Sequence, residues 1–187
     1  MDLFRQVKIE GMGKTAFPDD QYVLLLQEIE GEGRKLPIML NEKEANLAML
    51  TFASKDDAFE LSMHHVLLDL IWKVEGKFSR AEIFRIENGE FKTRVWIKKG
   101  NEEVHLPMHT TNAIALALLS NAPVYVLDAI LNSEHMRDLG NGQYSLPASL
   151  VGLEMLEEAL KDAIKKEKYE LASQLRDEIR KRKEKKK

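Results

Sequence analysis

Four consecutive polar residues, His109-Thr110-Thr111-Asn112, stand directly before a long apolar run and are the strongest candidates for catalysis. The run at 113–119 is apolar on every side, which predicts a helix buried all round. Thr110 or Thr111 is expected to cap this helix, because a threonine hydroxyl accepts from the free amides of a first turn. A helix N-terminus favours anions. We therefore expect phosphate to bind at this helix mouth, with His109 meeting its charge and the next three residues orienting it.

Hydrolysis of a phosphodiester needs an activated nucleophile and groups that stabilise charge on the phosphoryl oxygens. Glu44 and His64 are further candidates for these roles. Glu44 has a structural alternative, because it stands three residues after Asn41 and can complete a capping box. His64 has one too, as a hydrogen-bonded histidine beside a core face. His65 and Asp69, four residues apart, are compatible with a metal site but are a weak signal alone.

A second group of polar residues alternates along one predicted strand, at Lys92, Arg94, Trp96 and Lys98. Such a face can bind single-stranded nucleic acid, because bases stack on an indole and phosphates meet basic side chains. The alternative is a solvated strand face whose tryptophan packs on a neighbour or on a second subunit.

The composition is that of an ordinary soluble globular protein, with 44% hydrophobic and 32% charged residues among 187. No apolar run approaches the roughly 18 residues that span a bilayer, and the first residues lack the apolar core of a signal peptide. There are no cysteines, which excludes disulfides and thiolate metal sites. These observations predict a cytoplasmic protein with no membrane partner.

The net charge of −3 conceals a basic end. Residues 180–187 carry seven Lys or Arg and one Glu, so the rest of the chain sums to −9. A broad nucleic-acid footprint normally appears as a basic surface. Contact with nucleic acid is therefore expected to be local, and residues 183–187 are expected to form a solvated basic tail.

The spacing of apolar residues predicts a mixed α+β domain over 1–135, with helices packed on a β-sheet. Strands are predicted at 6–10, 22–29, 34–40, 80–86, 91–97, 102–106 and 124–127. A loop containing Gly11, Gly13 and Pro18 follows the first strand. Turns at 30–33 and at Asn88-Gly89 should close two hairpins. Helices are predicted from Asn41, at 62–74, at the apolar run and from Asp128.

Two of these helices carry apolar residues at helical spacing, which are expected to face the core. In the first helix they are Ala45, Ala48, Met49 and Phe52. In the second they are Met63, Leu67, Leu70, Ile71 and Val74.

The periodicity lapses after residue 135, and a Gly-rich segment with Pro147 predicts a linker at 136–150. Beyond it, apolar residues recur at three-and-four spacing on two arms, which predicts an antiparallel helical hairpin at 151–182. They are Leu153, Leu156, Leu160, Ala163, Ala172, Leu175 and Ile179.

Two well-separated blocks resemble the bifunctional nuclease domain family. The first is Arg34-Lys35-Leu36-Pro37-Ile38 followed by Glu44-Ala45, and the second runs from His109 through Ala122-Pro123-Val124-Tyr125-Val126. The resemblance covers about residues 1–131 and implies a mixed α+β fold with nuclease activity on DNA and RNA. Mg²⁺ or Mn²⁺ is the candidate cofactor, with no ligand assigned. The family's Arg-Pro-Ser-Asp is His109-Thr110-Thr111-Asn112 here, so an arginine and a carboxylate are both replaced.

The C-terminal hairpin resembles the UVR motif of excinuclease B and C subunits. The matching residues include Tyr169, Glu170, Leu175, Arg176 and Asp177. The resemblance implies contact with another UVR-bearing protein, and these five residues are the expected partner-binding set. A nuclease domain followed by such a hairpin is an arrangement found in bacteria.

Two functions stay open on this basis. The first is a nuclease that hydrolyses DNA or RNA. The second is a non-catalytic oligomeric adaptor that has lost the family's active-site polar residues. A symmetric dimer is expected in either case, because a domain of this size with Trp72, Trp96 and several strands leaves an apolar face or strand edge uncovered.

Overall fold

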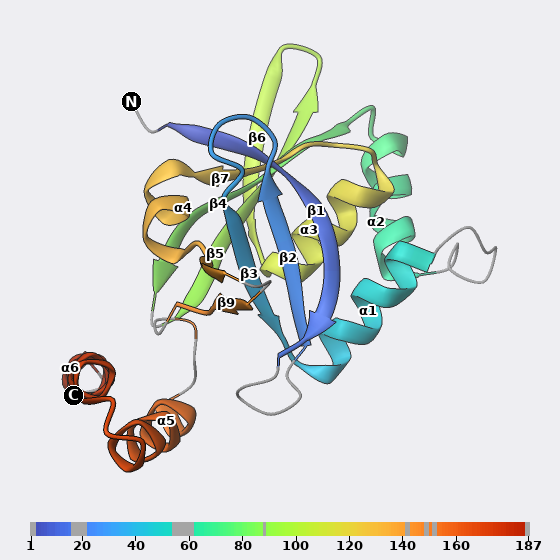
Figure 1. Cartoon of the computed structure of the whole chain (residues 1–187). Helices are drawn as coiled ribbons and strands as arrows, with labels where there is room; N and C mark the ends of the chain where they lie inside the picture. Colours follow the sequence, from blue (N-terminus) through green and yellow to red (C-terminus); the bar gives the residue numbers. More distant parts are fainter. Residues whose placement is uncertain are drawn as a thin grey trace.

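The computed structural model describes residues 3–15, 22–53, 62–87, 89–140, 143–147, 150 and 153–185. These residues form a mixed α+β structure (Figure 1). The strands are β1 (Phe4–Lys14), β2 (Tyr22–Glu28), β3 (Lys35–Leu40), β4 (Lys77–Glu87), β5 (Glu90–Lys99), β6 (Glu102–Met108), β7 (Val124–Leu127), β8 (Arg137–Gly140) and β9 (Gln143–Ser145). The helices are α1 (Glu42–Ala53), α2 (Met63–Lys73), α3 (Thr110–Leu119), α4 (Asp128–Glu134), α5 (Leu153–Lys165) and α6 (Tyr169–Lys185). The predicted fold class is confirmed.

The main sheet has seven strands in the order β3-β2-β1-β7-β4-β5-β6. It consists of two antiparallel three-stranded units, β1-β2-β3 and β4-β5-β6. The short strand β7 lies between them, antiparallel to β1 and parallel to β4. Figure 1 shows α1, α2 and α3 gathered along one side of this sheet.

The core lies between one face of the sheet and the helices. Ala113, Ile114, Leu116 and Ala117 of α3 are buried on all sides of the helix, as the apolar run predicts. Alternation along the strands places Ala81, Ile83, Val95, Val124 and Val126 against them. The opposite face of β4 and β5 carries charged and aromatic side chains.

The first strand is longer than predicted. Gly11 and Gly13 belong to β1, which pairs with β2 as far as Lys14. A register shift between Ile9 and Gly11 accommodates the glycines within the strand, because a bulge tolerates residues that weaken a regular ladder. Pro18 and Asn88 lie outside the described residues, but the predicted hairpin between β4 and β5 is present.

The predicted inward face of α1 is only partly correct. Ala45 and Ala48 are buried, and these small residues let α1 approach α3 closely. Met49 is exposed instead, so among the described residues no neighbour covers that edge of the helix. The side chain of Phe52 lies outside the described part of the chain.

The predicted core face of α2 is only partly correct, and Leu67 packs against the core as expected. The helix begins after Ser62 as expected, and Ile71 is buried. Met63, Leu70 and Val74 are each more than half exposed. The helix contacts α3 and β4, so its apolar residues on the side away from these elements meet solvent.

The segment predicted as a linker contains regular structure. Strands β8 and β9 pair with each other, and the amide of Met136 donates to the carbonyl of Lys35 in β3 at 2.8 Å. A short hairpin of this kind has too few apolar residues to give a periodic signal. The domain boundaries themselves stay a prediction.

The C-terminal helical hairpin is present as α5 and α6. Its seam is a separate core cluster of Leu156, Ala163, Ala172, Leu175 and Ile179. The chain reverses at Glu167, whose φ of 56° lies in the left-handed region. Among the described residues, no helix is long and apolar enough to cross a membrane.

Candidate functional site

The N-terminus of α3 is built differently from the expected threonine cap. His109 is the N-cap residue, with an extended backbone and no capping bond from its side chain. Thr110 and Thr111 already belong to the first helical turn and are buried. The Thr110 hydroxyl donates to the carbonyl of Phe91 and bonds the Thr93 hydroxyl at 2.8 Å. The cap prediction is therefore wrong, because these hydroxyls bond to neighbouring strands and helices rather than to the amides of their own turn.

Glu44 joins the first turns of α1 and α3. Its carboxylate accepts the amide of Asn41 at 2.8 Å, while the Asn41 side chain accepts the amide of Glu44 at 3.0 Å. This reciprocal pair is the capping box that the spacing predicts. The same carboxylate accepts the Thr111 hydroxyl at 3.3 Å and lies 3.3 Å from Nδ1 of His109. Glu44 thus occupies its structural role and contacts two candidate catalytic residues.

This carboxylate changes what the helix mouth can bind. A free helix N-terminus attracts an anion, but Glu44 already supplies negative charge beside the first turn of α3. His109 is the outermost group of the cluster, with 65% of its side chain exposed. An incoming phosphate would therefore meet the imidazole of His109 before it reached the helix amides.

His64 and Asn112 form a second contact, next to that between His109 and Glu44. Nε2 of His64 in α2 is 3.3 Å from the side-chain oxygen of Asn112 in α3. Nδ1 of His65 is 3.0 Å from the Ser62 hydroxyl, which caps α2. The structure therefore brings His64 and Asn112 together next to the pair formed by His109 and Glu44.

The side chains of this cluster do not fit a divalent metal ion. Mg²⁺ and Mn²⁺ prefer several oxygen ligands, usually carboxylates. Within the described residues, no three His, Asp or Glu side chains converge on one point. Glu44 also uses its oxygens for protein hydrogen bonds.

A pocket of about 770 Å³ opens beside this cluster. Its lining residues include Asn41, Glu44, His109 and Thr111. The β4–β5 hairpin also lines the pocket, through residues that include Arg85 and Lys92. Leu150, which precedes the C-terminal hairpin, is buried and also lines it.

Arg85 was not identified as a site residue from the sequence. It pairs with Lys92 across the β4–β5 hairpin, so two basic side chains lie on adjacent strands. Arg85 bonds Glu87 at 2.8 Å, and Lys92 bonds Glu90 at 3.0 Å. Exposed ion pairs of this kind contribute only about 0–1 kcal/mol, so a bound phosphate can replace the glutamates. The Asn88-Gly89 turn signal, taken with its strand register, would have placed Arg85 opposite Lys92.

The predicted nucleic-acid face on β5 is divided in the structure. Lys92 lines the pocket, whereas Arg94 and Trp96 belong to a stack farther along the strand. The Trp96 ring lies 4.2 Å from Arg80, 5.2 Å from Arg94 and 4.8 Å from the ring of His105. Lys98 is exposed beyond this stack.

Both arginines of that stack are paired with one buried carboxylate. Glu82 accepts from Arg80 and Arg94, each at 2.7 Å. Burial alone would raise the pKa of Glu82, but the hydrogen bonds, that of Arg80 foremost, hold it below its usual value. Arg80 also contacts Glu103 at 2.6 Å, so two carboxylates balance the two guanidinium groups of this sheet face.

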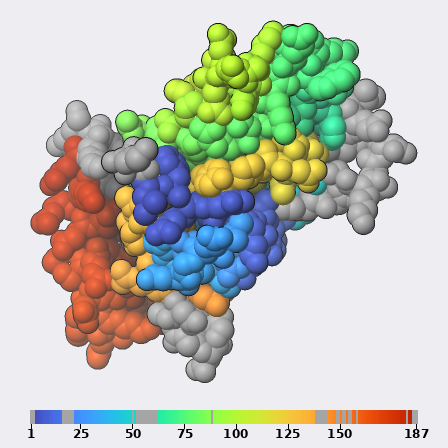
Figure 2. Space-filling view, turned by 90° about the horizontal axis from the view of Figure 1, so that it is seen from above, coloured from blue at the N-terminus to red at the C-terminus, as the bar shows by residue number. Residues whose placement is uncertain are grey.

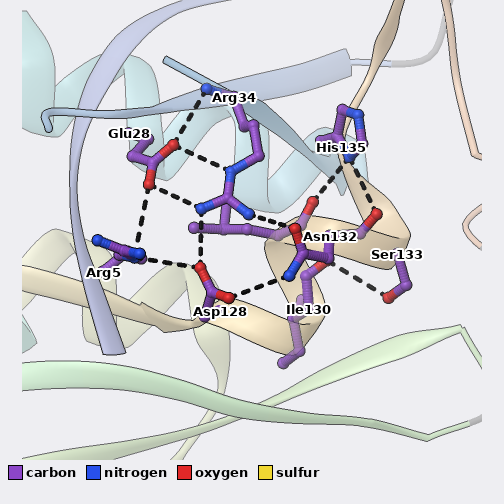
Figure 3. A network of polar contacts seen from close by, with 9 residues as sticks. Arg5, Glu28, Arg34, Asp128, Ile130, Asn132, Ser133 and His135 are labelled. Atoms are coloured by element: carbon purple, nitrogen blue, oxygen red, sulfur yellow. Dashed lines mark hydrogen bonds and ion pairs between the residues drawn. The ribbon is translucent and has the colours of Figure 1, made fainter. Parts of the chain in front are cut away.

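A second buried ion-pair network was not predicted (Figure 3). Arg34 makes two bonds to Glu28, at 2.7 and 3.0 Å, and one to Asp128 at 2.8 Å. Arg5 contacts Asp128 at 3.1 Å, and the Glu28 side chain has no exposed surface. The hydrogen bond from Arg34 holds the pKa of Glu28 below its usual value, and Arg34 does the same for Asp128. The network ties β1, the β2–β3 turn and α4 together.

The expected partner-binding residues lie in α6. Tyr169 and Glu170 are exposed at its start, and Arg176 and Asp177 are exposed along its length. Leu175 is buried in the seam with α5 and so stabilises the hairpin itself. Leu171 and Ile164 are exposed near Tyr169.

Comparison with known families matches two regions of the chain. The bifunctional nuclease domain model matches residues 24–138, and the UvrB/uvrC motif model matches residues 153–185. A search of curated proteins finds no match. The first match spans more than half of the 187 residues and contains the site cluster from Glu44 to Asn112. The chain therefore belongs to the bifunctional nuclease domain family and carries a C-terminal UvrB/uvrC motif.

Proposed function

We propose that this protein hydrolyses phosphodiester bonds of DNA or RNA in the pocket beside α3. One observation carries the proposal: a single pocket is lined both by the pair of His109 and Glu44 and by the basic residues Arg85 and Lys92. Hydrolysis of a phosphodiester uses a proton acceptor together with groups that stabilise charge on the phosphoryl oxygens, and these residues can supply both. The family match supports the same reaction class.

The roles follow from the contacts. If Nδ1 of His109 donates to Glu44, Nε2 is left free to take a proton from water. The water oxygen then attacks phosphorus, and the imidazolium returns the proton to the leaving oxygen. Arg85 and Lys92 stabilise the negative charge that grows on the phosphoryl oxygens. Neither Mg²⁺ nor Mn²⁺ takes part in these steps, because the side chains of the described residues do not form a site for either ion.

The substrate contacts are expected to be local and salt-dependent. Arg85 and Lys92 are the basic side chains of the pocket wall, whereas Arg80 and Arg94 are paired with Glu82. Few phosphate contacts give weak binding that falls with salt concentration. Such a site reads no base sequence, so cleavage should tolerate many sequences.

The test compares three variants on labelled single- and double-stranded DNA and RNA, each with and without Mg²⁺ or Mn²⁺. His109→Ala and Arg85→Ala should each lower the cleavage rate at least about tenfold, which corresponds to about 1.4 kcal/mol of transition-state stabilisation. His105→Ala is the matched control, because this histidine lies on β6 outside the pocket. Thermal unfolding should be unchanged in His109→Ala. Equal loss in the control, or no loss in the pocket variants, would place the reaction elsewhere.

A non-catalytic adaptor is the second candidate. It is favoured by the exposed Ile164, Tyr169 and Leu171 of the hairpin, which leave an apolar surface for a partner. The chain also carries His109 and Asn112 where the family's arginine and aspartate stand. Absence of cleavage by the wild-type protein on all four substrates, under every metal condition, would favour this function.

A further inference from the structure

The C-terminal helical hairpin carries its charge unevenly along its length. Residues 180–187 hold seven Lys or Arg and one Glu. Together with the three glutamates of 153–160 at the start of α5, this end of the hairpin sums to +3. Residues 161–179, around the turn between α5 and α6, hold five basic and five acidic residues and are neutral. We call residues 180–185, the last turns of α6, the basic end.

The basic end lies beside the start of α5 and therefore near the pocket. Nζ of Lys183 is 2.6 Å from a carboxylate oxygen of Glu157, in the second turn of α5. That helix begins three residues after Leu150, which is buried and lines the pocket. The chain from Leu150 to Glu157 spans at most about 25 Å. A strand that rises about 3.4 Å per nucleotide covers this distance in about eight nucleotides. Figure 2 shows the hairpin (red) along one side of the main domain.

The cations of the basic end are accessible to a phosphate. Arg180, Lys181 and Lys183 are exposed. Arg180 pairs with Asp177 at 3.3 Å and Lys183 pairs with Glu157, but all four side chains are between 43% and 70% exposed. Exposed ion pairs contribute little, so phosphate oxygens can take the place of either carboxylate. The rest of the chain sums to −9, so this segment attracts a polyanion more strongly than the body of the protein does.

We propose that the basic end of α6 binds the backbone phosphates of a single strand of DNA or RNA whose scissile bond lies in the pocket. A duplex is stiff over this distance, whereas a single strand can follow the surface from the helix to the pocket. Arg85 and Lys92 contact phosphate in the pocket, and Arg180, Lys181 and Lys183 add further contacts. Most of the affinity and of its salt dependence therefore comes from the helix. The path of the strand rests on the proposed function, but binding at the basic end does not.

Fluorescence anisotropy of a labelled single strand of about 12 nucleotides, a length typical of single-strand sites, tests the binding. The full chain carries His109→Ala to suppress cleavage, and a gel shows that the strand stays intact. Lys181→Glu with Lys183→Glu should raise the dissociation constant at least about tenfold and lower the salt slope by about 0.7 for each lost contact. Lys165→Glu with Lys166→Glu is the matched control, because it makes the same charge change on exposed residues at the other end of the hairpin. Circular dichroism checks folding, and Lys181→Gln with Lys183→Gln serves if the reversed pair does not fold.

Strand length tests whether one strand reaches both places. Arg85→Ala should weaken binding of the strand of about 12 nucleotides but not of one of about four, which is too short to span from the basic end to the pocket. No binding by the parent protein, an equal loss in the matched control, or an equal effect of Arg85→Ala at both lengths would overturn the proposal. Binding that depends on the basic end, without cleavage by the wild type, would uphold it and reject the proposed function. Cleavage with an affinity indifferent to both basic-end variants would do the reverse.

Discussion

Glu44 links a helix cap to the candidate site. Its carboxylate closes the capping box of α1 and also contacts Thr111 and His109 at the start of α3. Replacing it would therefore change helix stability and the site together. For that reason the proposed reaction is tested at His109 and Arg85, whose side chains support no buried structure.

The ion pairs of Arg34 are expected to stabilise the folded protein. Replacing Arg34 by Met leaves Glu28 fully buried without its main partner. Breaking a buried ion pair from one side costs about 3–5 kcal/mol of unfolding free energy. Urea unfolding at neutral pH measures this loss. Arg85→Met is the control, because its exposed pair with Glu87 should contribute no more than about 1 kcal/mol.

The pH dependence provides a second check on the same substitution. Arg34 holds the pKa of Glu28 below its ordinary value of 4.5, so the unfolded chain binds that proton more tightly than the folded one. The wild type should therefore lose stability as the pH falls below about 4.5, through the lowered folded pKa. The variant lacks this stabilisation, so its difference from the wild type should shrink in acid. A difference that stays constant with pH would contradict the assigned role.

Local contacts between residues could be predicted from the sequence, and distant ones could not. The capping box links Asn41 to Glu44 within one turn, and its residue types indicate it directly. Thr111 and Glu44 are 67 positions apart, and Arg34 and Asp128 are 94 apart. Nothing in the residue types pairs them, because their contact depends on how the sheet assembles.

Among the elements, helix and strand positions were largely predicted, but the buried face of α2 was predicted only in part. Periodicity shows that one side of a helix is apolar, yet it does not show whether a neighbour covers that side. Met63, Leu70 and Val74 fulfil the spacing and remain exposed. The hairpin β8–β9 was missed for the opposite reason, since three- and four-residue strands are too short to give a pattern.

The β2–β3 turn requires glycine at position 31. Gly31 has a φ of 115°, and a side chain there would lie 2.8 Å from an Oε1 atom of Glu28. Gly31→Ala should destabilise the protein by about 1–3 kcal/mol, because it strains the backbone and displaces a buried carboxylate. Gly11→Ala is the control, since a side chain at Gly11 meets nothing within 4 Å. Thermal unfolding of both variants checks this, and equal shifts in melting temperature would argue against the contact.

On the scale of the whole molecule, the described residues form two separate apolar cores. One unites the sheet with α1, α3 and α4, and the other joins α5 to α6. Leu175→Asp places a charge in the smaller core and should unfold the hairpin. The main unfolding transition should be unchanged. The far-UV circular dichroism signal of the helices, at roughly 222 nm, should decrease. Arg176→Asp, an exposed change at the next position, should leave both signals intact. If Leu175→Asp also removed the main unfolding transition, the two cores would depend on each other.

The position of β7 has a consequence for the order of folding. This four-residue strand is the last of the main sheet to be synthesised, yet it lies between β1 and β4 at the centre. The units β1-β2-β3 and β4-β5-β6 can each form by local hairpin closure. They cannot join until residues 124–127 are available, and the contact between Phe4 and Leu127 closes a loop of most of the domain. Because closing long loops is slow, a nascent chain should hold two half-sheets with exposed inner edges until β7 inserts.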